Sequence, residues 1–331
     1  MRQIGMVIDL NKCIGCQTCT MACKTQWTIG EGRDYMYWNH VETMPGKGYP
    51  RGYMDMKDTG FDAKGKVIIG DLPSKADYGG DFEFNYAAFM EGKDKVLAPT
   101  KNPTWGPNWD EEVGGGEYPN NYYFYLPRLC NHCTNPACVP ACDVKAIRKR
   151  DEDGIVVIDL EKCEGHKRCI KACPYKKPYF NPTRVNPIEK GVGQSEKCIS
   201  CFPRLEKGIA SACVRQCVGR ARFQSYMDDV DGPVYKLVKK WKVALPLMPE
   251  KGTKPNVFYV PPLSSPKFDK NGKPTDEPRI PLAYLKKLFG PEVEGALKTL
   301  KAEIDKKAKT QPTELMDILI AYKHKDMMKL T

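Results

Sequence analysis

Fifteen cysteines, gathered into four short groups, constrain the fold of this 331-residue chain more than any other feature. Within each group two to eleven residues separate neighbouring cysteines, and longer cysteine-free stretches separate the groups. In order along the chain, the groups are Cys13, Cys16, Cys19 and Cys23 (group one); Cys130, Cys133, Cys138 and Cys142 (group two); Cys163, Cys169 and Cys173 (group three); and Cys198, Cys201, Cys213 and Cys217 (group four). Thiols this close in sequence predict loops that wrap around metal centres.

The spacing within the groups favours iron–sulfur clusters over zinc or disulfide bonds. Group one has the pattern C-x2-C-x2-C-x3-C, in which three close thiolates hold one four-iron cluster and the fourth ligates its neighbour. Structural zinc sites usually combine two close ligands with two distant ones, so a third cysteine between Cys16 and Cys23 would be surplus. Disulfide frameworks are typical of short secreted chains. We therefore predict four iron–sulfur clusters.

An internal repeat links groups one and three. Residues 6–24, the first copy, align without a gap to residues 156–174, the second copy, and 10 of 19 positions are identical. The first copy has Cys16 where the second copy has His166. An imidazole there could ligate a fourth iron, as histidines do in Rieske centres, fill the space of a missing iron, or face solvent in a polar loop. We favour a [3Fe-4S] cluster, with a histidine-ligated [4Fe-4S] cluster as the alternative.

Exchange of the fourth cysteine between paired groups predicts which thiols share a cluster. The spacing leaves open whether group one pairs with group four or with group two. If groups one and four pair, and groups two and three pair, the predicted ligands are Cys13, Cys16, Cys19 and Cys217 (set A, [4Fe-4S]); Cys23, Cys198, Cys201 and Cys213 (set B, [4Fe-4S]); Cys130, Cys133, Cys138 and Cys173 (set C, [4Fe-4S]); and Cys142, Cys163 and Cys169 (set D, [3Fe-4S]). His166 is then a possible ligand or a space-filling residue in set D.

The segments around the cysteines predict an α+β fold with two ferredoxin-like [4Fe-4S]-binding units related by internal duplication. Short apolar strands lead into groups one and three, a β-hairpin is expected around DEDG at residues 151–154, and brief helices are expected after each fourth cysteine. Residues 1–24 and 125–230 would form this double ferredoxin-like core. Residues 25–124, rich in Gly, Pro and aromatic residues, are expected to be a loop-rich insertion packed on it.

Residues 231–331 contain no cysteine and are expected to form an extended C-terminal docking arm with helices. Residues 283–309 and 312–324 have apolar residues at three-to-four spacing, which predicts surface helices joined by Pro-rich extended chain such as residues 256–266. A polar tail of about 100 residues has too little core to fold alone. We therefore expect it to wrap the cluster core and a partner subunit.

Charge and hydropathy exclude several classes of partner. The formal net charge of +11 counts every cysteine as neutral, so thiolate clusters would offset most of it. Lys and Arg are scattered and no recognition motif is present, so we expect no nucleic-acid partner. No apolar run reaches the roughly 18 residues that span a bilayer, and the N-terminal MRQIGMVIDL has neither a signal-peptide core nor a twin-arginine pair. We expect no membrane span and no export signal in this chain.

The cysteine motifs together resemble a known family. In this order, the segments CIGCQTCTMACK, CNHCTNPACVPAC, CEGHKRCIKACPYKKPYFNP and SEKCISCFPRLEKGIASACVRQC resemble the electron-transfer β subunit of respiratory nitrate reductase and its relatives in the DMSO reductase superfamily. The resemblance implies that groups one and four pair, as do groups two and three. The nitrate reductase subunit has a tryptophan in place of His166 and holds a three-iron cluster there, which implies three [4Fe-4S] clusters and one [3Fe-4S] cluster.

The chain length and the segment YFYLPRLCNHC are most similar to the periplasmic branch, which includes selenate, chlorate and perchlorate reductases, dimethylsulfide dehydrogenase and ethylbenzene dehydrogenase. This resemblance implies a catalytic α subunit with a bis-molybdopterin guanine dinucleotide (bis-MGD) cofactor, and a haem b γ subunit or a cytochrome c. It also implies a periplasmic location, reached by co-export with a twin-arginine-signalled partner. The cytoplasmic face of the membrane is the alternative.

The predicted function is to relay single electrons through four clusters between a molybdenum subunit and a haem subunit or cytochrome. The complex would be an oxyanion reductase of the selenate, chlorate, perchlorate or nitrate type. One alternative is the same role in a hydrocarbon or dimethylsulfide dehydrogenase, with electrons leaving the molybdenum site, and another is a stand-alone polyferredoxin. No catalytic residue is expected in this chain, because it has no catalytic triad, HExxH motif or phosphate-binding glycine loop.

Overall fold

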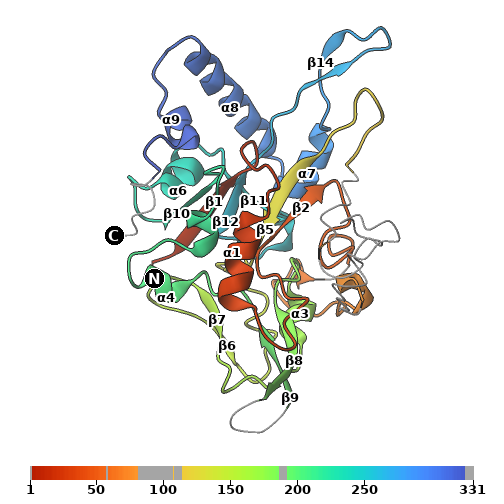
Figure 1. Cartoon of the computed structure of the whole chain (residues 1–331), viewed down its shortest axis with the longest axis vertical. Helices are drawn as coiled ribbons and strands as arrows, with labels where there is room; N and C mark the ends of the chain where they lie inside the picture. The colour runs from red at the N-terminus through yellow and green to blue at the C-terminus, as the bar shows by residue number, and fades with distance from the viewer. Residues whose placement is uncertain (1, 57–58, 81–106, 108–113, 186–191, 325–331) are drawn as a thin grey trace, which may run out of the picture.

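A four-stranded sheet forms the centre of the chain in its computed structural model (Figure 1). Strand β1 (Ile4–Asp9) pairs antiparallel with β10 (Arg222–Tyr226) and parallel with β12 (Val257–Val260). Strand β11 (Leu245–Pro246) completes the sheet antiparallel to β12. The structure describes residues 2–56, 59–80, 107, 114–185 and 192–324.

Strand β1 separates two hydrophobic cores. All six of its residues are buried, and alternate side chains point to opposite faces of the sheet. Met6 and Ile8 pack in the larger core, which also contains cysteines of groups one, two and four. Val7 packs in the second core together with Leu300 and Leu315 of the C-terminal region. The strand predicted before group one is therefore confirmed, and it anchors the first cysteine loop.

The remaining strands form antiparallel pairs around this centre. They are β2 (His40–Met44) with β5 (Phe124–Arg128), β3 (Gly60–Phe61) with β4 (Val67–Ile68), β6 (Ile147–Lys149) with β7 (Val156–Ile158), β8 (Tyr179–Val185) with β9 (Val192–Glu196), and β13 (Pro266–Phe268) with β14 (Pro274–Pro278). The pairing of Lys149 with Val156 encloses residues 151–154, so the predicted hairpin at DEDG is confirmed.

The helices are short near the cysteines and longer in the C-terminal region. They are α1 (Thr18–Trp27), η1 (Ala76–Tyr78), α3 (Arg168–Ala172), α4 (Phe202–Leu205), α5 (Ala212–Arg215), α6 (Pro233–Tyr235), η2 (Lys236–Lys240), η3 (Pro249–Lys251), α7 (Leu282–Phe289), α8 (Val293–Ala308) and α9 (Glu314–Ile320). The expectation of a helix after each fourth cysteine is wrong. Each helix begins before the fourth cysteine of its repeat copy, just after the loop that contains Cys16 or His166. Helix α1 therefore contains Cys23, and α3 ends directly before Cys173.

The C-terminal region contributes both surface helices and part of the core. The predicted helix over residues 283–309 is confirmed as α7 and α8, which are separated at Gly290 (φ +83°) and Pro291, residues that favour a helix stop. Helix α9 confirms the predicted helix in residues 312–324. Strands β11 and β12 lie within the central sheet, so residues 245–260 belong to the core rather than to an arm.

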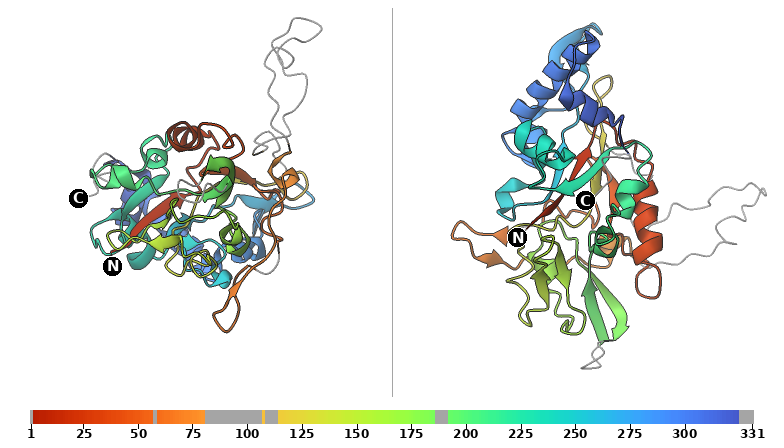
Figure 2. Two further views of the ribbon diagram at one scale, coloured as in Figure 1. Left: turned by 90° about the horizontal axis from the view of Figure 1, so that it is seen from below. Right: turned by 90° about the vertical axis from the view of Figure 1, so that its left-hand side faces the viewer.

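Two views agree on the arrangement of the ends of the molecule. Helices α8 and α9 lie at one end, and the hairpins β6–β7 and β8–β9 lie at the other, with the central sheet between them (Figures 1 and 2).

Within the insertion, Met36, Trp38 and Tyr49 are buried in the larger core beside the cysteines. None of the described helices is long and apolar enough to cross a membrane.

Candidate functional site

The two repeat copies form the same loop around their first two ligand positions. In the first copy, Gly15 has φ +69° and Gln17 has φ +57°; in the second, Gly165 has φ +75° and Lys167 has φ +58°. A Cβ atom at Gly15 would lie 2.6 Å from the Tyr125 ring, and one at Gly165 would lie 2.3 Å from a backbone oxygen. Glycine therefore supplies both the left-handed backbone and the space that the loop needs.

Three cavities are each lined by the thiols of one predicted set. They are lined by Cys23, Cys198, Cys201 and Cys213 (set B); Cys130, Cys133, Cys138 and Cys173 (set C); and Cys142, Cys163 and Cys169 (set D). Each set combines cysteines from two sequence groups. The cavities bring together cysteines of groups one and four, and cysteines of groups two and three. The spacing of the cysteines did not by itself choose between this pairing and the alternative.

Three of the four thiols of set A, those of Cys13, Cys19 and Cys217, lie near one another. Burial raises the pKa of Cys13 to about 11, and the neighbouring Cys19 and Cys217 thiolates add to this shift. Cys16 is exposed on the loop between Cys13 and α1. Set A therefore lies at the surface at its Cys16 corner.

Thiols of different sets shift one another's pKa, and these shifts show which sets are neighbours. Burial raises the pKa of Cys213 in set B to about 12, and Cys19 and Cys217 of set A contribute. Burial and, next, Cys130 of set C raise the pKa of Cys198 in set B. Burial raises the pKa of Cys169 in set D to about 12, with a smaller contribution from Cys173 of set C. Thiols of sets A and B, of sets B and C, and of sets C and D thus lie near one another.

The donor set fits iron–sulfur clusters. All 15 cysteines are free of disulfide bonds. In the described part of the chain no three His, Cys, Asp or Glu side chains lie close enough to hold a single metal ion, and the thiols instead surround shared cavities. Burial raises the pKa of Cys133, Cys169 and Cys213, and the positive iron of a cluster would stabilise their thiolate form.

Hydrogen-bond donors point at the sulfur atoms, as they do in cluster-binding loops. The backbone N–H donors are Ala146 to Cys142 Sγ (3.2 Å), Ser195 to Cys163 Sγ (3.4 Å), Ser200 to Cys198 Sγ (3.3 Å) and Ala221 to Cys217 Sγ (3.3 Å). Trp27 Nε1 donates to Cys201 Sγ at 3.2 Å. The last cysteine of group two and the last cysteine of group four thus each accept a hydrogen bond from the backbone N–H of the residue four positions later. Groups two and four therefore share this feature of their loops.

His132 places an unpaired donor beside set C. Its side chain is buried and lines the set C cavity, and the Val156 N–H donates to Nδ1 at 3.2 Å. Burial, followed by Lys197 and Lys149, lowers the pKa of His132, so the ring is neutral and its proton is on Nε2. This Nε2 is buried and has no hydrogen-bond partner in the described structure. A buried N–H in this position fits a sulfur acceptor in set C.

His166 lies at the surface edge of set D. Its side chain is 46% exposed, and Nδ1 lies 3.0 Å from Asp143 Oδ1 while Nε2 lies 3.4 Å from Glu164 Oε2. The hydrogen bond to Asp143 raises the pKa of His166. Asp143 directly follows Cys142, so a carboxylate next to the thiols of set D holds the imidazole. Both ring nitrogens therefore face carboxylates in this arrangement.

Buried charges that sequence analysis missed support the cysteine loops. Arg128 donates to Glu42 Oε1 from Nε (2.8 Å) and from Nη2 (2.7 Å), and to the Tyr175 carbonyl from Nη1 at 2.9 Å. Arg128 thus ties the insertion to the loop after Cys173. Arg222 is a second buried arginine, and it donates to Cys19 Sγ at 3.2 Å. Neither arginine carries a sequence signal, because each acquires its partner only through strand pairing.

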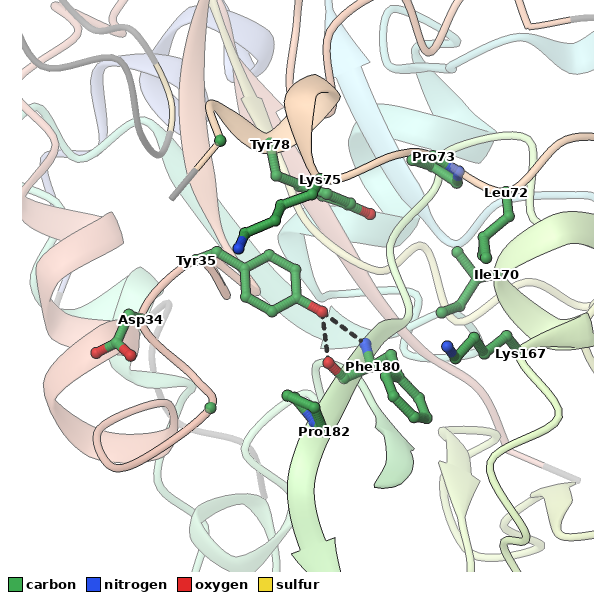
Figure 3. Close-up of a pocket in the computed structure, with 12 residues that line it drawn as sticks. Asp34, Tyr35, Leu72, Pro73, Lys75, Tyr78, Lys167, Ile170, Phe180 and Pro182 are labelled. Atoms are coloured by element: carbon green, nitrogen blue, oxygen red, sulfur yellow. Dashed lines mark hydrogen bonds between the residues drawn. The ribbon is translucent and has the colours of Figure 1, made fainter. Parts of the chain in front are cut away.

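A larger cavity, of about 530 Å³, lies between the insertion and the second copy (Figure 3). Tyr35, Tyr78 and Lys75 line it from the insertion, and Lys167 and Ile170 line it from the segment around α3. The Tyr35 hydroxyl donates to the Phe180 carbonyl at 2.5 Å and accepts from the Phe180 N–H at 3.0 Å, as the dashed lines in Figure 3 mark. This tyrosine therefore fixes strand β8 against the insertion.

Comparison with known proteins identifies the family. Residues 121–226 match a 4Fe-4S dicluster domain, and residues 4–25 match a 4Fe-4S binding domain. The dimethylsulfide dehydrogenase subunit beta of Rhodovulum sulfidophilum is 58% identical over 331 residues, covering 100% of this chain and 99% of that protein. The chain belongs to this family of oxidoreductase β subunits. It is an iron–sulfur protein that transfers electrons.

Other members of the family belong to reductases with different names. The selenate reductase subunit beta of Thauera selenatis is 57% identical over 329 residues, covering 98% of each chain. The respiratory nitrate reductase subunit beta of Haloferax mediterranei is 51% identical over 325 residues, covering 96% of this chain and 90% of that protein. The resemblance stated from the cysteine motifs is thereby confirmed, and iron–sulfur β subunits of this kind accompany a catalytic subunit.

Proposed function

We propose that this chain relays single electrons between a molybdenum-containing catalytic subunit, with a bis-MGD cofactor, and a haem b γ subunit or a cytochrome c. The observation that carries the proposal is that thiols from two sequence groups line each of three cavities, for sets B, C and D. Clusters bound there supply one-electron chemistry. The chain's own residues hold the clusters, keep water away and deliver hydrogen bonds to the sulfurs.

The proposed cofactors are three [4Fe-4S] clusters in sets A, B and C and one [3Fe-4S] cluster in set D. Four cysteines for each of the first three sets, and three for the last, support this count. The shared loop geometry of the two copies supports the proposed internal duplication into two ferredoxin-like units. The position of α8 and α9 at one end of the molecule supports a docking role for the C-terminal segment beyond the core sheet.

We assign His166 as a residue that occupies the fourth corner of set D without binding iron. Its exposure and its bonds to Asp143 and Glu164 support this assignment, because both ring nitrogens already have polar partners. His132 is assigned as a donor to a sulfur in set C, since its buried Nε2 lacks another partner in the described structure.

The exposed end of set A fits the catalytic subunit. Ile14 and Val218 are 64% and 62% exposed, and each is adjacent in sequence to a cysteine of set A. Permanent subunit interfaces are more apolar than the rest of a protein surface. We expect Ile14→Asp together with Val218→Asp to abolish co-purification of the catalytic subunit. Val185→Asp, on an exposed residue of β8, is the control that should leave it unchanged.

The substrate class proposed for the complex is an oxyanion of the selenate, chlorate, perchlorate or nitrate type, with electrons flowing toward molybdenum. The names of the relatives from Thauera selenatis and Haloferax mediterranei support it. The relative from Rhodovulum sulfidophilum supports the second candidate, a dehydrogenase in which electrons flow the other way. A periplasmic location by co-export with the catalytic subunit is proposed with the same branch, and the cytoplasmic face remains the alternative.

Electron paramagnetic resonance of the oxidised complex tests the cluster assignment, because an oxidised three-iron cluster is paramagnetic and an oxidised four-iron cluster of the ordinary kind is silent. We expect a three-iron signal of about one spin per β subunit and about 15 iron atoms in the β subunit. His166→Ala should change neither quantity. A missing signal together with about 16 iron atoms would instead assign His166 as a ligand.

A further inference from the structure

Arg222 is a fully buried cation at the junction of sets A and B. It is the first residue of β10, pairs with Ile8 of β1 and is 1% exposed. Its Nη2 donates to Cys19 Sγ at 3.2 Å and to Asn39 Oδ1 at 2.7 Å, and its Nη1 lies 3.8 Å from Met6 Sδ. None of these described partners is a carboxylate.

Arg128 shows what a buried arginine usually requires. It is also 1% exposed, but Glu42 neutralises it through two hydrogen bonds of 2.7 and 2.8 Å. A buried charge without an opposite charge is strongly unfavourable. Since the described partners of Arg222 include only one ionisable group, the thiol of Cys19, its counter-charge must come from the thiols and what they bind.

The thiols near Arg222 come from both sets. Burial lowers the pKa of Arg222, but the thiolates of Cys19, Cys213 and Cys217 raise it by more, so the net shift is upward. Cys19 and Cys217 are in set A, whereas Cys213 is in set B. Its other two partners, Asn39 and Met6, line the set B cavity, so the guanidinium lies between the two proposed clusters.

We propose that Arg222 is the shared counter-charge of sets A and B and holds the reduction potentials of both clusters above the values they would have without it. The inference rests on the proposed ligand sets. An added electron makes a cluster more negative, so a nearby cation stabilises the reduced form, and a low-dielectric interior strengthens that effect. The direct hydrogen bond to Cys19 makes the expected effect larger for set A than for set B.

Arginine suits this role because its charge is permanent. Lys177 also lies near two sets, close to Cys198 and Cys173, but burial lowers its pKa well below the usual value for lysine. A lysine in such a place can lose its proton, whereas Arg222 keeps its charge at every pH at which the protein is folded. Arg222 is thus the fixed charge between the first two sets.

The test is a redox titration of the complex, purified with its partner subunits and followed by electron paramagnetic resonance. In Arg222→Gln we expect full iron content and at least a tenfold fall in the ratio of reduced to oxidised set A cluster at a fixed ambient potential, which is 59 mV for a one-electron couple. Set B should shift less, and sets C and D should not shift. Loss of its signal in Cys19→Ser identifies the set A cluster.

Two further variants make the result decisive. Arg128→Lys is the matched control, because it alters a buried arginine that contacts no thiol, and it should leave the set A potential unchanged. If Arg222→Gln fails to assemble, Arg222→Lys decides, since a shorter side chain that can lose its proton weakens the positive charge beside Cys19 and should lower the same potential. Full iron content with unmoved potentials would overturn the role of Arg222. Lack of iron in the wild-type chain would overturn the proposed function itself.

Discussion

The two copies of the repeated segment share a loop but differ in their surroundings. Gln17 of the first copy is held to β2, because its amide donates to the Val41 carbonyl at 2.9 Å and accepts from the Val41 N–H at 3.2 Å. The corresponding residue of the second copy, Lys167, extends over the Phe180 ring at 3.9 Å from its centroid and lines the open cavity. Residue 17 is therefore fixed to a strand, whereas the matching residue 167 lies at an open cavity.

One residue accounts for a second difference. Pro174 follows Cys173 in the second copy, and a residue before proline is kept out of the helical conformation, so α3 ends at Ala172. Lys24 occupies the matching place in the first copy, and α1 continues to Trp27, whose indole donates to Cys201 of set B. The shared residues of the repeat thus determine the conformation of the loop. The residue after the fourth cysteine determines how far the helix extends, and so whether it contacts a thiol of a neighbouring set.

The strongest test removes the same cysteine from both copies. Cys19→Ser and Cys169→Ser each take one thiol from a set, so we expect each to lose its cluster, about four irons for the first and about three for the second. Because the proposed relay runs through all four sets, turnover of the complex should fall to background in both. Iron content and turnover of the purified complex measure this. Full activity in either variant would contradict the electron relay.

His166→Cys makes the second copy match the first at the position where they differ most. A fourth thiol beside Cys142, Cys163 and Cys169 should complete the site, so we expect about one more iron per chain and loss of the three-iron signal. Iron analysis and electron paramagnetic resonance measure the change. Unchanged iron content and an unchanged signal would show that residue 166 does not control the number of irons.

Lys24→Pro makes the first copy match the second at its end. A proline inside α1 removes a helical hydrogen bond and clashes with the preceding turn, which should destabilise the protein by roughly 3 kcal/mol. The Lys24 ammonium also donates to the carbonyls of Arg33 and Asp34, and these bonds would be lost. Thermal unfolding measures the effect. Trp27→Phe, which removes the bond to Cys201 but keeps an aromatic ring in the core, should lower the set B potential with a smaller loss of stability.

A change of pH probes the stability of β2, the strand whose Val41 holds Gln17 of the first copy. Burial, and then the neighbouring Lys177, lowers the pKa of His40 to about 4, against about 6.5 in an unfolded chain. The unfolded state therefore binds a proton first as the pH falls, and stability should decline between about pH 6.5 and 4, by a few kcal/mol at most. Unfolding at several pH values measures the slope. His40→Gln should flatten it in this window, and an equal slope in the variant would exclude His40 as its source.

Several strands and helices were predictable because the residues that determine them lie within the same short segment of sequence. The strand before group one, the hairpin at residues 151–154 and the C-terminal helices follow from periodicity and turn residues. The position of the helices relative to the fourth cysteine was not predicted, because it depends on the left-handed conformation of Gln17 and Lys167. Neither residue type signals that conformation.

The sequence by itself determined that the chain carries iron–sulfur clusters, since ligand spacing within a loop of a few residues is set by covalent geometry. Only the tertiary structure showed which thiols of distant groups line a common cavity and which buried charges lie beside them. Arg222 reaches Cys19 because β10 pairs with β1, and β12 enters the sheet although it lies about 250 residues beyond β1. Such contacts depend on the packing of distant segments, and no local pattern in the sequence encodes them.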